Sequence, residues 1–333
     1  MRHKAAIAVI IPTYNAERFV HEAIDSVRTQ TISDWECVIV DDGSTDGTPN
    51  QLAAYRDPRI RSIRQDHRGD REARARGLSL TSAEKIVFLD ADDCLYPDAL
   101  ARYVMCLERH AAADVAYGER TLIKEGGDSF ALEWRAIFNK HPHGDALEAI
   151  LRRPFLSTPS QACLRREAIP SIDWLGHHGI GGDWVMLAAA AIKHNFAYIG
   201  KAPVVKYRLH RGSFLRTLAN DMQGTVNIQE FEELLHRLFS LPDLEGRLGV
   251  AKVRKLRHAA EATCLAIKGQ EHLRCNNMRT ARRYFSAALR SGSRDIRDIL
   301  CWTATFCPRL ILYAGPLFGT FESKTLSPLR KST

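Results

Sequence analysis

Continuous hydrophobic runs alternate with amphipathic stretches over the first 120 residues. Residues 6–11 and 86–89 are uninterrupted apolar runs, and residues 35–40 form another that contains one polar residue, Glu36. Residues 19–27 and 97–110 instead place apolar side chains at helical spacing. Strands that are apolar on both faces and separated by helices are typical of a parallel sheet covered on both sides, so the pattern predicts an α/β fold. The same patterns predict a strand at 60–64 and helices at 48–55 and 71–79.

Beyond residue 120 the pattern changes twice. Residues 121–180 are rich in loop signals. A helix is predicted at 184–194, followed by short strands at 196–199 and 204–209. After residue 220 the chain is almost purely helical, which predicts a separate helical region at the C-terminal end.

This helical end is basic as well as amphipathic. Residues 247–268 and 279–289 combine apolar positions at helical spacing with Lys and Arg, and residues 299–318 form an apolar stretch broken by prolines and a glycine. Such a stretch can lie along a membrane interface beside basic neighbours, or it can pack on the protein body. Peripheral membrane contact through these helices is therefore one expectation, and internal packing is the other.

Charge and cysteine content indicate which partners and which cellular compartment to expect. The 333 residues carry 47 Lys and Arg against 39 Asp and Glu, a net charge of +8. This excess suits an anionic partner such as a nucleotide, an acidic glycan or a membrane surface, with a solvated basic surface as the alternative. We do not expect a nucleic-acid partner. The eight cysteines form no Cys-x-x-Cys pair, so we expect free thiols in a reducing, cytoplasmic compartment.

The N-terminal sequence mimics a signal peptide without completing one. MRHKAAIAVII has a basic end and a short apolar run, but PTYN follows where a small-residue cleavage site would stand. We therefore interpret the run as the first buried strand. No window of about 20 uncharged apolar residues is present, so a membrane-spanning helix is not expected.

The first acidic cluster, VDDGSTDGT, follows the second apolar run. Its glycines and hydroxyl residues permit a tight turn, and a carboxylate held there can accept a hydrogen bond from a nucleobase imino N–H. Asx-turn chemistry alone is the competing interpretation, more serious for Asp46 than for Asp42. An EF-hand calcium loop is excluded because its twelfth position is Ala53 instead of Glu.

The second acidic cluster, FLDADD, follows the apolar run at 86–89. Asp90, Asp92 and Asp93 repel one another unless a positive charge lies among them or all three are in water. An EF-hand is again excluded, because the twelfth position is Ala101. Mg²⁺ or Mn²⁺ suits such a site, because these ions bind through one or two carboxylates together with substrate phosphate oxygens.

Taken together, these motifs resemble family 2 glycosyltransferases of the GT-A fold. The resemblance rests on PTYN, Gln30-Thr31, VDDGSTDGT and FLDADD with Pro97-Asp98, in the family's order and spacing over about residues 6–120. It implies a GT-A-like, mostly parallel sheet flanked by helices, a nucleotide-sugar donor (usually a UDP-sugar), a divalent metal ion and inversion at the anomeric carbon. The implied domain would span residues 1–215, divided near 120 into donor and acceptor halves, with a helical region at 216–333.

The resemblance is thinner downstream, where it implies the catalytic base. Gly182-Asp183-Trp184 is similar to the family's acidic motif, although Gly182 and Val185 stand where further acidic residues are common. Asp183 would then deprotonate the acceptor hydroxyl. A helix N-cap aspartate is the alternative interpretation of the same residues.

The family pattern also implies the remaining site residues. Arg74 matches the arginine of the family's ARNxG helix and would pair with the nucleotide phosphates or hold Asp92 in place. His210, in a segment similar to the family's Tyr-Arg-x-His, would reach the metal or the diphosphate, or be structural. Whether Asp92 or Asp93 binds the metal stays open. The complete predicted nucleotide-sugar site is Pro12, Thr13, Tyr14, Asn15, Glu17, Asp41, Asp42, Arg74, Asp90, Ala91 and Asp92, with Asp92, Asp93 and His210 at the metal.

The sequence thus predicts a metal-dependent, inverting sugar transferase. The family resemblance implies that its acceptor would be a glycan or glycolipid in bacterial surface-polysaccharide or glycolipid synthesis, in the cytoplasm or at the inner face of the membrane. A dinucleotide-dependent oxidoreductase is disfavoured, because PTYN stands where GxGxxG is needed. A non-catalytic nucleotide-sugar-binding protein with a decayed site is the remaining alternative, suggested by the departures at Gly182 and Val185.

Overall fold

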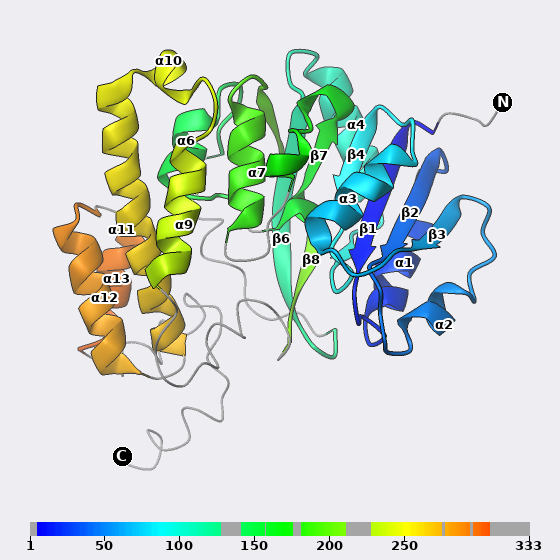
Figure 1. The fold of residues 1–333 in the computed structure, drawn as a ribbon, viewed down its shortest axis with the longest axis horizontal. Coiled ribbons are helices and arrows are strands. Elements are labelled where there is room, and N and C mark those ends of the chain that lie inside the picture. The colour runs from blue at the N-terminus through cyan, green and yellow to red at the C-terminus, as the bar shows by residue number, and fades with distance from the viewer. Residues whose placement is uncertain are drawn as a thin grey trace, which may run out of the picture. The chain divides into compact units, whose positions relative to one another are not determined.

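The predicted apolar runs form the centre of one eight-stranded sheet (Figure 1). A computed structural model describes residues 5–127, 141–156, 158–175, 181–210, 228–274, 277–293 and 296–306. The strand order is β3-β2-β1-β4-β7-β6-β8-β5. The strands are β1 (Ile7–Thr13), β2 (Trp35–Asp41), β3 (Ile60–Arg64), β4 (Lys85–Phe88), β5 (Cys94–Leu95), β6 (Val115–Lys124), β7 (Ala162–Arg165) and β8 (Phe196–Leu209).

The sheet is mixed. The pairs β1–β2, β2–β3 and β1–β4 are parallel, as expected from the hydrophobic pattern. The pairs β4–β7, β6–β7 and β5–β8 are antiparallel. The α/β fold is confirmed, and the parallel part is the half that the continuous apolar runs predicted. Because β1, β2 and β4 run parallel, the polar loops after them meet at one edge of the sheet.

Alternating side chains of β1 and β2 are buried against helices on the two faces of the sheet. On one face, Ile7, Val9 and Ile39 pack with apolar residues of α1 (Val20–Arg28) and α4 (Ala99–Arg109). On the other face, Val38 and Val40 pack against α3 (Asp70–Ser79), which lies over the sheet in Figure 1.

Glycine is required where α3 crosses the sheet. A Cβ built on Gly77 would collide with the Cγ2 of Ile10 in β1. Helix and strand therefore approach more closely than a side chain allows, which accounts for this glycine of the ARARG segment.

Several elements differ from the sequence predictions. The two strands predicted at 196–199 and 204–209 are one continuous strand, β8, which passes through Gly200 at φ +124°. The strands β5, β6 and β7 were not predicted. β7 and the end of β6 lie in the segment 121–180, where we expected loops, and all three strands obtain their partners from distant segments. The remaining described helices of this part are α2 (Thr48–Leu52), α6 (Leu147–Arg152) and α7 (Gly182–Ala191).

Contacts group the chain into two units. The described residues of the first unit lie within Met1–Arg120, Lys140–Ile150 and Pro154–Arg208, and most of those of the second lie within Leu209–Thr333. The domain boundaries expected from the sequence stay a prediction.

The C-terminal part of the second unit is helical, as predicted. It contains α9 (Ile228–Phe239), α10 (Leu244–Leu248), α11 (Val250–Arg274), α12 (Met278–Arg290) and α13 (Ile296–Ala304). Leu273, Phe285 and Cys301 form part of its core. In the described part of the chain, no helix is both long and apolar enough to cross a membrane. The broken apolar stretch at 299–318 extends beyond the described residues.

Candidate active site

The loops that follow β1 and β2 are joined by hydrogen bonds. The Asn15 backbone N–H donates to Ser44 Oγ at 2.9 Å, and the Thr45 N–H donates to Asn15 Oδ1 at 2.8 Å. The Gly47 N–H donates to the Glu17 carboxylate at 2.6 Å. Asn15 and Glu17, both predicted to bind the donor, therefore also hold the PTYN loop against the acidic loop after β2.

Thr13 and Tyr14 lie at the end of β1 beside the same loop. Thr13 is buried, and within the described residues its hydroxyl has no hydrogen-bond partner. The Tyr14 side chain is 47% exposed, and its ring stacks on His67 with a centroid distance of 4.1 Å and an interplanar angle of 24°. Pro12 precedes them in β1 and is half-buried. The result is a flat aromatic surface next to an unsatisfied buried hydroxyl.

Asp42 is buried and fully engaged by the loop that precedes α3. Its Oδ1 accepts from Gln65 Nε2 at 2.8 Å and from the Arg68 N–H at 2.9 Å. Its Oδ2 accepts from the Gly69 N–H at 2.7 Å and lies 2.8 Å from His67 Nδ1. A carboxylate has about four acceptor positions, and each is used. A nucleobase N–H could therefore reach Asp42 only by displacing one of these donors.

Asp41, the other predicted base-binding carboxylate, is also buried. Its Oδ1 accepts from the Ser44 N–H at 2.9 Å, and its Oδ2 lies 3.4 Å from Arg64 Nη1. This carboxylate fixes the turn after β2.

Arg74 lies at the centre of the acidic cluster. The side chain is buried, and its Nη1 donates to Asp183 Oδ1 at 3.0 Å and to the Leu175 carbonyl at 3.3 Å. Its Nη2 lies 3.4 Å from Asp90 Oδ1 and 3.6 Å from Asp70 Oδ2. Burial alone lowers the pKa of Arg74, but these carboxylates outweigh it and raise the pKa. One guanidinium therefore joins the candidate base to the aspartate cluster after β4.

Asp183 occupies the first turn of α7. The helix begins after Gly181, which has φ +76° and acts as the N-cap, so the interpretation of Asp183 as an N-cap is wrong. Its side chain is 32% exposed. Burial raises the pKa of Asp183, and the Arg74 charge lowers it less than burial raises it. Asp183 thus combines access to solvent with a carboxylate more basic than usual.

Two hydroxyl residues that we did not predict, Thr158 and Ser160, complete the cluster. The Thr158 hydroxyl lies 2.9 Å from Asp90 Oδ2 and 3.3 Å from Asp93 Oδ2, and the Asp90 N–H donates to Ser160 Oγ at 3.1 Å. Burial, with repulsion from neighbouring carboxylates, raises the pKa of Asp90 to about 7 despite the Arg74 charge. The segment STPSQ contains these hydroxyls, but nothing in its spacing indicated their partners.

Asp93 and Asp92 have different environments. Asp93 is completely buried, and its Oδ1 accepts from the Arg208 N–H at 3.1 Å. Burial first, and then repulsion from Asp92 and Asp90, raises its pKa well above the usual range. Asp92 is only half-buried, and its backbone carbonyl accepts from Arg208 Nε at 2.9 Å. Ala91, which precedes Asp92, is half-buried as well.

The positive charge that the acidic cluster required is partly supplied by the protein itself. Arg74 lies beside Asp90, and the buried Arg208 lies beneath the turn, where its Nη2 also pairs with Glu22 at 2.7 Å. The sequence indicated Arg208 only as part of the YRLH segment, without a role.

The described residues do not form a complete metal cage. Across them, no three His, Cys, Asp or Glu side chains converge on one point as metal ligands. Mg²⁺ and Mn²⁺ do not need such a cage when a diphosphate supplies further oxygens, so a half-buried Asp92 fits this coordination and the enclosed Asp93 does not. His210 belongs to the second unit, and its metal role stays a prediction.

Solved structures share the fold. The mannosyltransferase PcManGT from Pyrobaculum calidifontis, in complex with GDP-Man and Mn²⁺, matches with a TM-score of 0.53 and 20% identity over 94% of this chain and 82% of that one. TarS 1–349 from S. aureus, in complex with UDP-GlcNAc, matches with a TM-score of 0.51 and 17% identity over 91% of both chains. At these identities the similarity establishes the fold.

Proteins that match by sequence have a higher identity to this chain than these solved structures. A PGL/p-HBAD biosynthesis glycosyltransferase of Mycobacterium bovis is 35% identical over 141 residues, covering 40% of this chain and 55% of the relative. An uncharacterized glycosyltransferase of Nostoc is 30% identical over 220 residues, covering 61% and 65%. The chain thus spans between half and two thirds of these relatives. Residues 8–173 match the model of glycosyl transferase family 2. Through this domain, the chain belongs to glycosyltransferase family 2.

Proposed function

We propose that this protein transfers a sugar from a nucleotide-sugar donor to an acceptor hydroxyl, with Asp183 as the general base. The observation that carries this proposal is the Arg74 guanidinium, which holds Asp183 at 3.0 Å and Asp90 at 3.4 Å. It fixes a carboxylate of raised pKa beside the cluster that the family resemblance assigns to the donor. A general base works best when its pKa approaches the operating pH, and burial moves Asp183 in that direction.

The reaction would be a single displacement. The acceptor oxygen attacks the anomeric carbon while its proton passes to an Asp183 carboxylate oxygen. The bond between that carbon and the diphosphate oxygen breaks on the opposite face, so the configuration inverts and the nucleoside diphosphate leaves. Arg74 would keep Asp183 ionised and correctly placed before the proton is transferred.

The nucleotide would bind at the carboxyl ends of β1 and β2. The stacked rings of Tyr14 and His67 offer a flat face to a base, and the unpaired Thr13 hydroxyl offers a hydrogen bond. The solved relatives named above bind UDP-GlcNAc and GDP-Man, which supports a nucleotide-sugar donor without selecting the base. Asp41 and Asp42 would act mainly by fixing the loops around the base.

A divalent ion fits beside Asp92. When bound, Mg²⁺ or Mn²⁺ neutralises charge on the departing diphosphate. Asp92 would hold it, with His210 as a further predicted ligand, while the hydrogen bonds and burial of Asp93 suit it to shaping the turn. The Mn²⁺ of the Pyrobaculum relative supports this assignment.

We further propose a glycan or glycolipid acceptor and a role in bacterial surface-polysaccharide or glycolipid synthesis, at the cytoplasmic face of the membrane. The mycobacterial relative, whose name places it in PGL/p-HBAD biosynthesis, supports a biosynthetic role.

The test combines binding with transfer. A panel of nucleotide sugars is first screened for thermal stabilisation, with and without Mn²⁺, and the stabilising donor is used in a radiolabelled transfer assay. Asp183→Asn should retain donor binding and lose transfer by about 10²-fold or more. Asp98→Asn, the same change at an exposed position, should leave both unchanged. Full turnover in Asp183→Asn contradicts the assignment, and donor binding without transfer in the wild type favours the non-catalytic alternative.

A further inference from the structure

Helix α12 of the second unit carries a stripe of arginines without carboxylate partners. Arg279, Arg283 and Arg290 are all exposed, and at about 100° per residue they project within an arc of about 40°. The helix contains no Asp or Glu, and no carboxylate pairs with these three side chains among the residues that the structure describes. The opposite side of the helix, which includes Phe285, is buried. The stripe therefore places three positive charges on the outer face of α12.

The neighbouring helix α13 exposes apolar side chains. Ile299 and Leu300 are 37% and 40% exposed, and Phe306, just beyond the end of the helix, is 54% exposed. Asp298, the acidic residue of this helix, is buried and pairs with Arg153 at 3.0 Å. The outer face of α13 is therefore largely apolar, and none of its described side chains carries a negative charge there.

Direct contacts hold the two helices side by side. Trp302 Nε1 donates to Ser286 Oγ at 2.9 Å, and the Arg282 guanidinium lies 3.9 Å from the centre of the Phe306 ring. Both helices bury their opposite faces in the core of the second unit described above. Because they share that core and touch along their sides, the arginine stripe and the apolar side chains belong to one outer surface.

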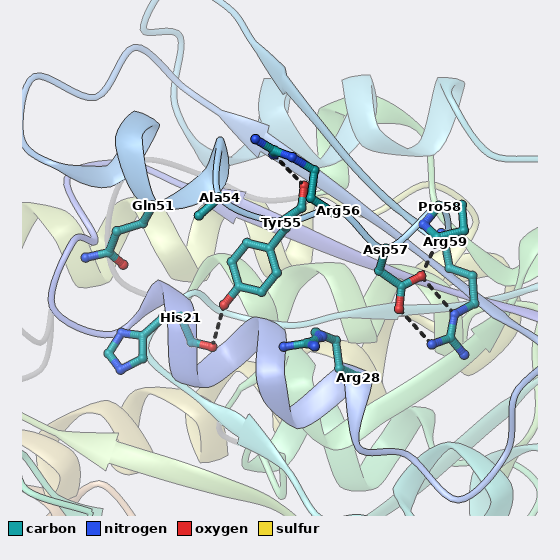
Figure 2. Close-up of a pocket in the computed structure, with 9 residues that line it drawn as sticks. All are labelled: His21, Arg28, Gln51, Ala54, Tyr55, Arg56, Asp57, Pro58 and Arg59. Carbon is teal, nitrogen blue, oxygen red and sulfur yellow. Dashed lines mark hydrogen bonds and ion pairs between the residues drawn. The ribbon is translucent and has the colours of Figure 1, made fainter.

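Arginines around the pocket beside α1 in the first unit have a different environment. Figure 2 shows the Arg59 guanidinium directed to the Asp57 carboxylate, at 2.7 Å. Arg28, which lines the same pocket, pairs with Asp25 at 2.8 Å. These charges are compensated within the protein. Arginines without such partners, beside exposed apolar side chains, instead indicate a surface that meets an external anionic partner.

We propose that the outer surface of α12 and α13 docks on an anionic membrane, with the arginine stripe among the lipid phosphates and the exposed apolar side chains between the headgroups. Basic side chains are attracted to the negative charge of such a surface, and apolar side chains are buried at the boundary of the acyl chains. A nucleic acid would pair with the arginines but leave the apolar side chains in water. The inference deepens the membrane setting proposed above and rests on it, whereas the chemistry assigned to Asp183 is a separate question.

The experiment measures cosedimentation of the full chain with phosphatidylcholine vesicles that contain or lack phosphatidylglycerol. The stripe variant removes the three arginines of α12: Arg279→Gln/Arg283→Gln/Arg290→Gln. The matched control removes the same charge from exposed positions of the first unit: Arg56→Gln/Arg76→Gln/Arg109→Gln. Each arginine strengthens binding to an anionic surface about fivefold, so the stripe variant should bind about 10²-fold more weakly and with a smaller dependence on salt. The control should bind as the wild type does.

A second variant tests the apolar half of the surface. Phe306→Ala should weaken vesicle binding about tenfold and keep its salt dependence, whereas Met105→Ala, at a similarly exposed position of α4, should not weaken it. The proposal is overturned if the wild type does not prefer vesicles with phosphatidylglycerol, or if the stripe variant binds as its control does. A Phe306→Ala variant that unfolds more easily but binds vesicles unchanged also overturns it, because the ring would then pack within the chain. None of these outcomes depends on sugar transfer, so a failure leaves the proposed reaction untouched.

Discussion

Replacement of Arg74 by Met tests how the candidate base is held. The substitution keeps roughly the length of the side chain but removes the cation that pairs with Asp183, Asp90 and Asp70. Breaking a buried ion pair from one side costs about 3–5 kcal/mol, because an uncompensated charge stays behind. The side chains of Asp183 and Asp90 are 32% and 28% exposed in the folded protein, so water replaces part of the lost interaction. We therefore expect the substitution to lower the free energy of unfolding by about 3 kcal/mol, the lower end of that range.

The same substitution should change the pH profile in a defined direction. Asp183 acts as a base only when ionised, so activity falls as the pH drops through its pKa. Burial already raises that pKa, while the Arg74 charge opposes the rise. Removing Arg74 therefore raises the pKa further, and the acid limb of kcat moves to higher pH. Loss of positioning should also lower kcat at its optimum by about 10²-fold.

Release of nucleoside diphosphate measured from pH 4 to 9, together with thermal unfolding, checks both expectations. Arg76→Met on the same helix removes an equal charge from an exposed position and should alter neither measurement. Arg74→Lys should be intermediate, since one ammonium cannot replace the two nitrogens that contact different aspartates. An unchanged acid limb and an unchanged kcat in Arg74→Met would refute the role assigned to this arginine.

Four further outcomes follow from the same geometry. Thr158→Val should lower the free energy of unfolding by about 1–3 kcal/mol, measured by denaturant titration, because the half-buried Asp90 and the buried Asp93 lose the hydroxyl that they share. Asp42→Asn should destabilise the fold by about 1.5–3 kcal/mol, since its new amide group meets backbone donors, and hydrogen exchange at residues 65–69 should rise. Gly77→Ala should cost about 1–3 kcal/mol in thermal unfolding through overpacking against β1, whereas an unchanged melting temperature would contradict the contact. Asp92→Ala should weaken donor binding by calorimetry only when Mn²⁺ is present; an equal loss in chelator would argue against a metal role.

The hydrophobic pattern predicted the parts of the fold that depend on local sequence. The segments that became β1, β2 and β4 consist mainly of consecutive apolar residues, and the helices between them show helical spacing, so both patterns were visible in the sequence. The strand β5 was missed because two residues have no readable period, and β7 was missed because it lies inside a segment rich in loop signals. Their strand conformation comes from hydrogen bonds to β8 and to β4 and β6, which lie far away along the chain.

The motifs identified the right neighbourhood of the candidate site but not the function of each side chain in it. The carboxyl ends of parallel strands meet at one edge, so the clusters after β1, β2 and β4 had to converge. Sequence spacing could not show that the Asp42 carboxylate accepts hydrogen bonds from the loop before α3. Nor could it show that Asp93 is buried while Asp92 is only half-buried.

By itself, the sequence determined the α/β class, the order of the central elements and the family, because these depend on local periodicity and on motifs read residue by residue. Only the tertiary structure decided which charges meet. Arg74 and Asp183 are 109 positions apart, and Thr158 reaches Asp90 across 68. Such contacts result from how strands and helices pack, and burial then sets the pKa of each carboxylate. No local pattern contains that information, because the energy of a charge depends on its three-dimensional surroundings.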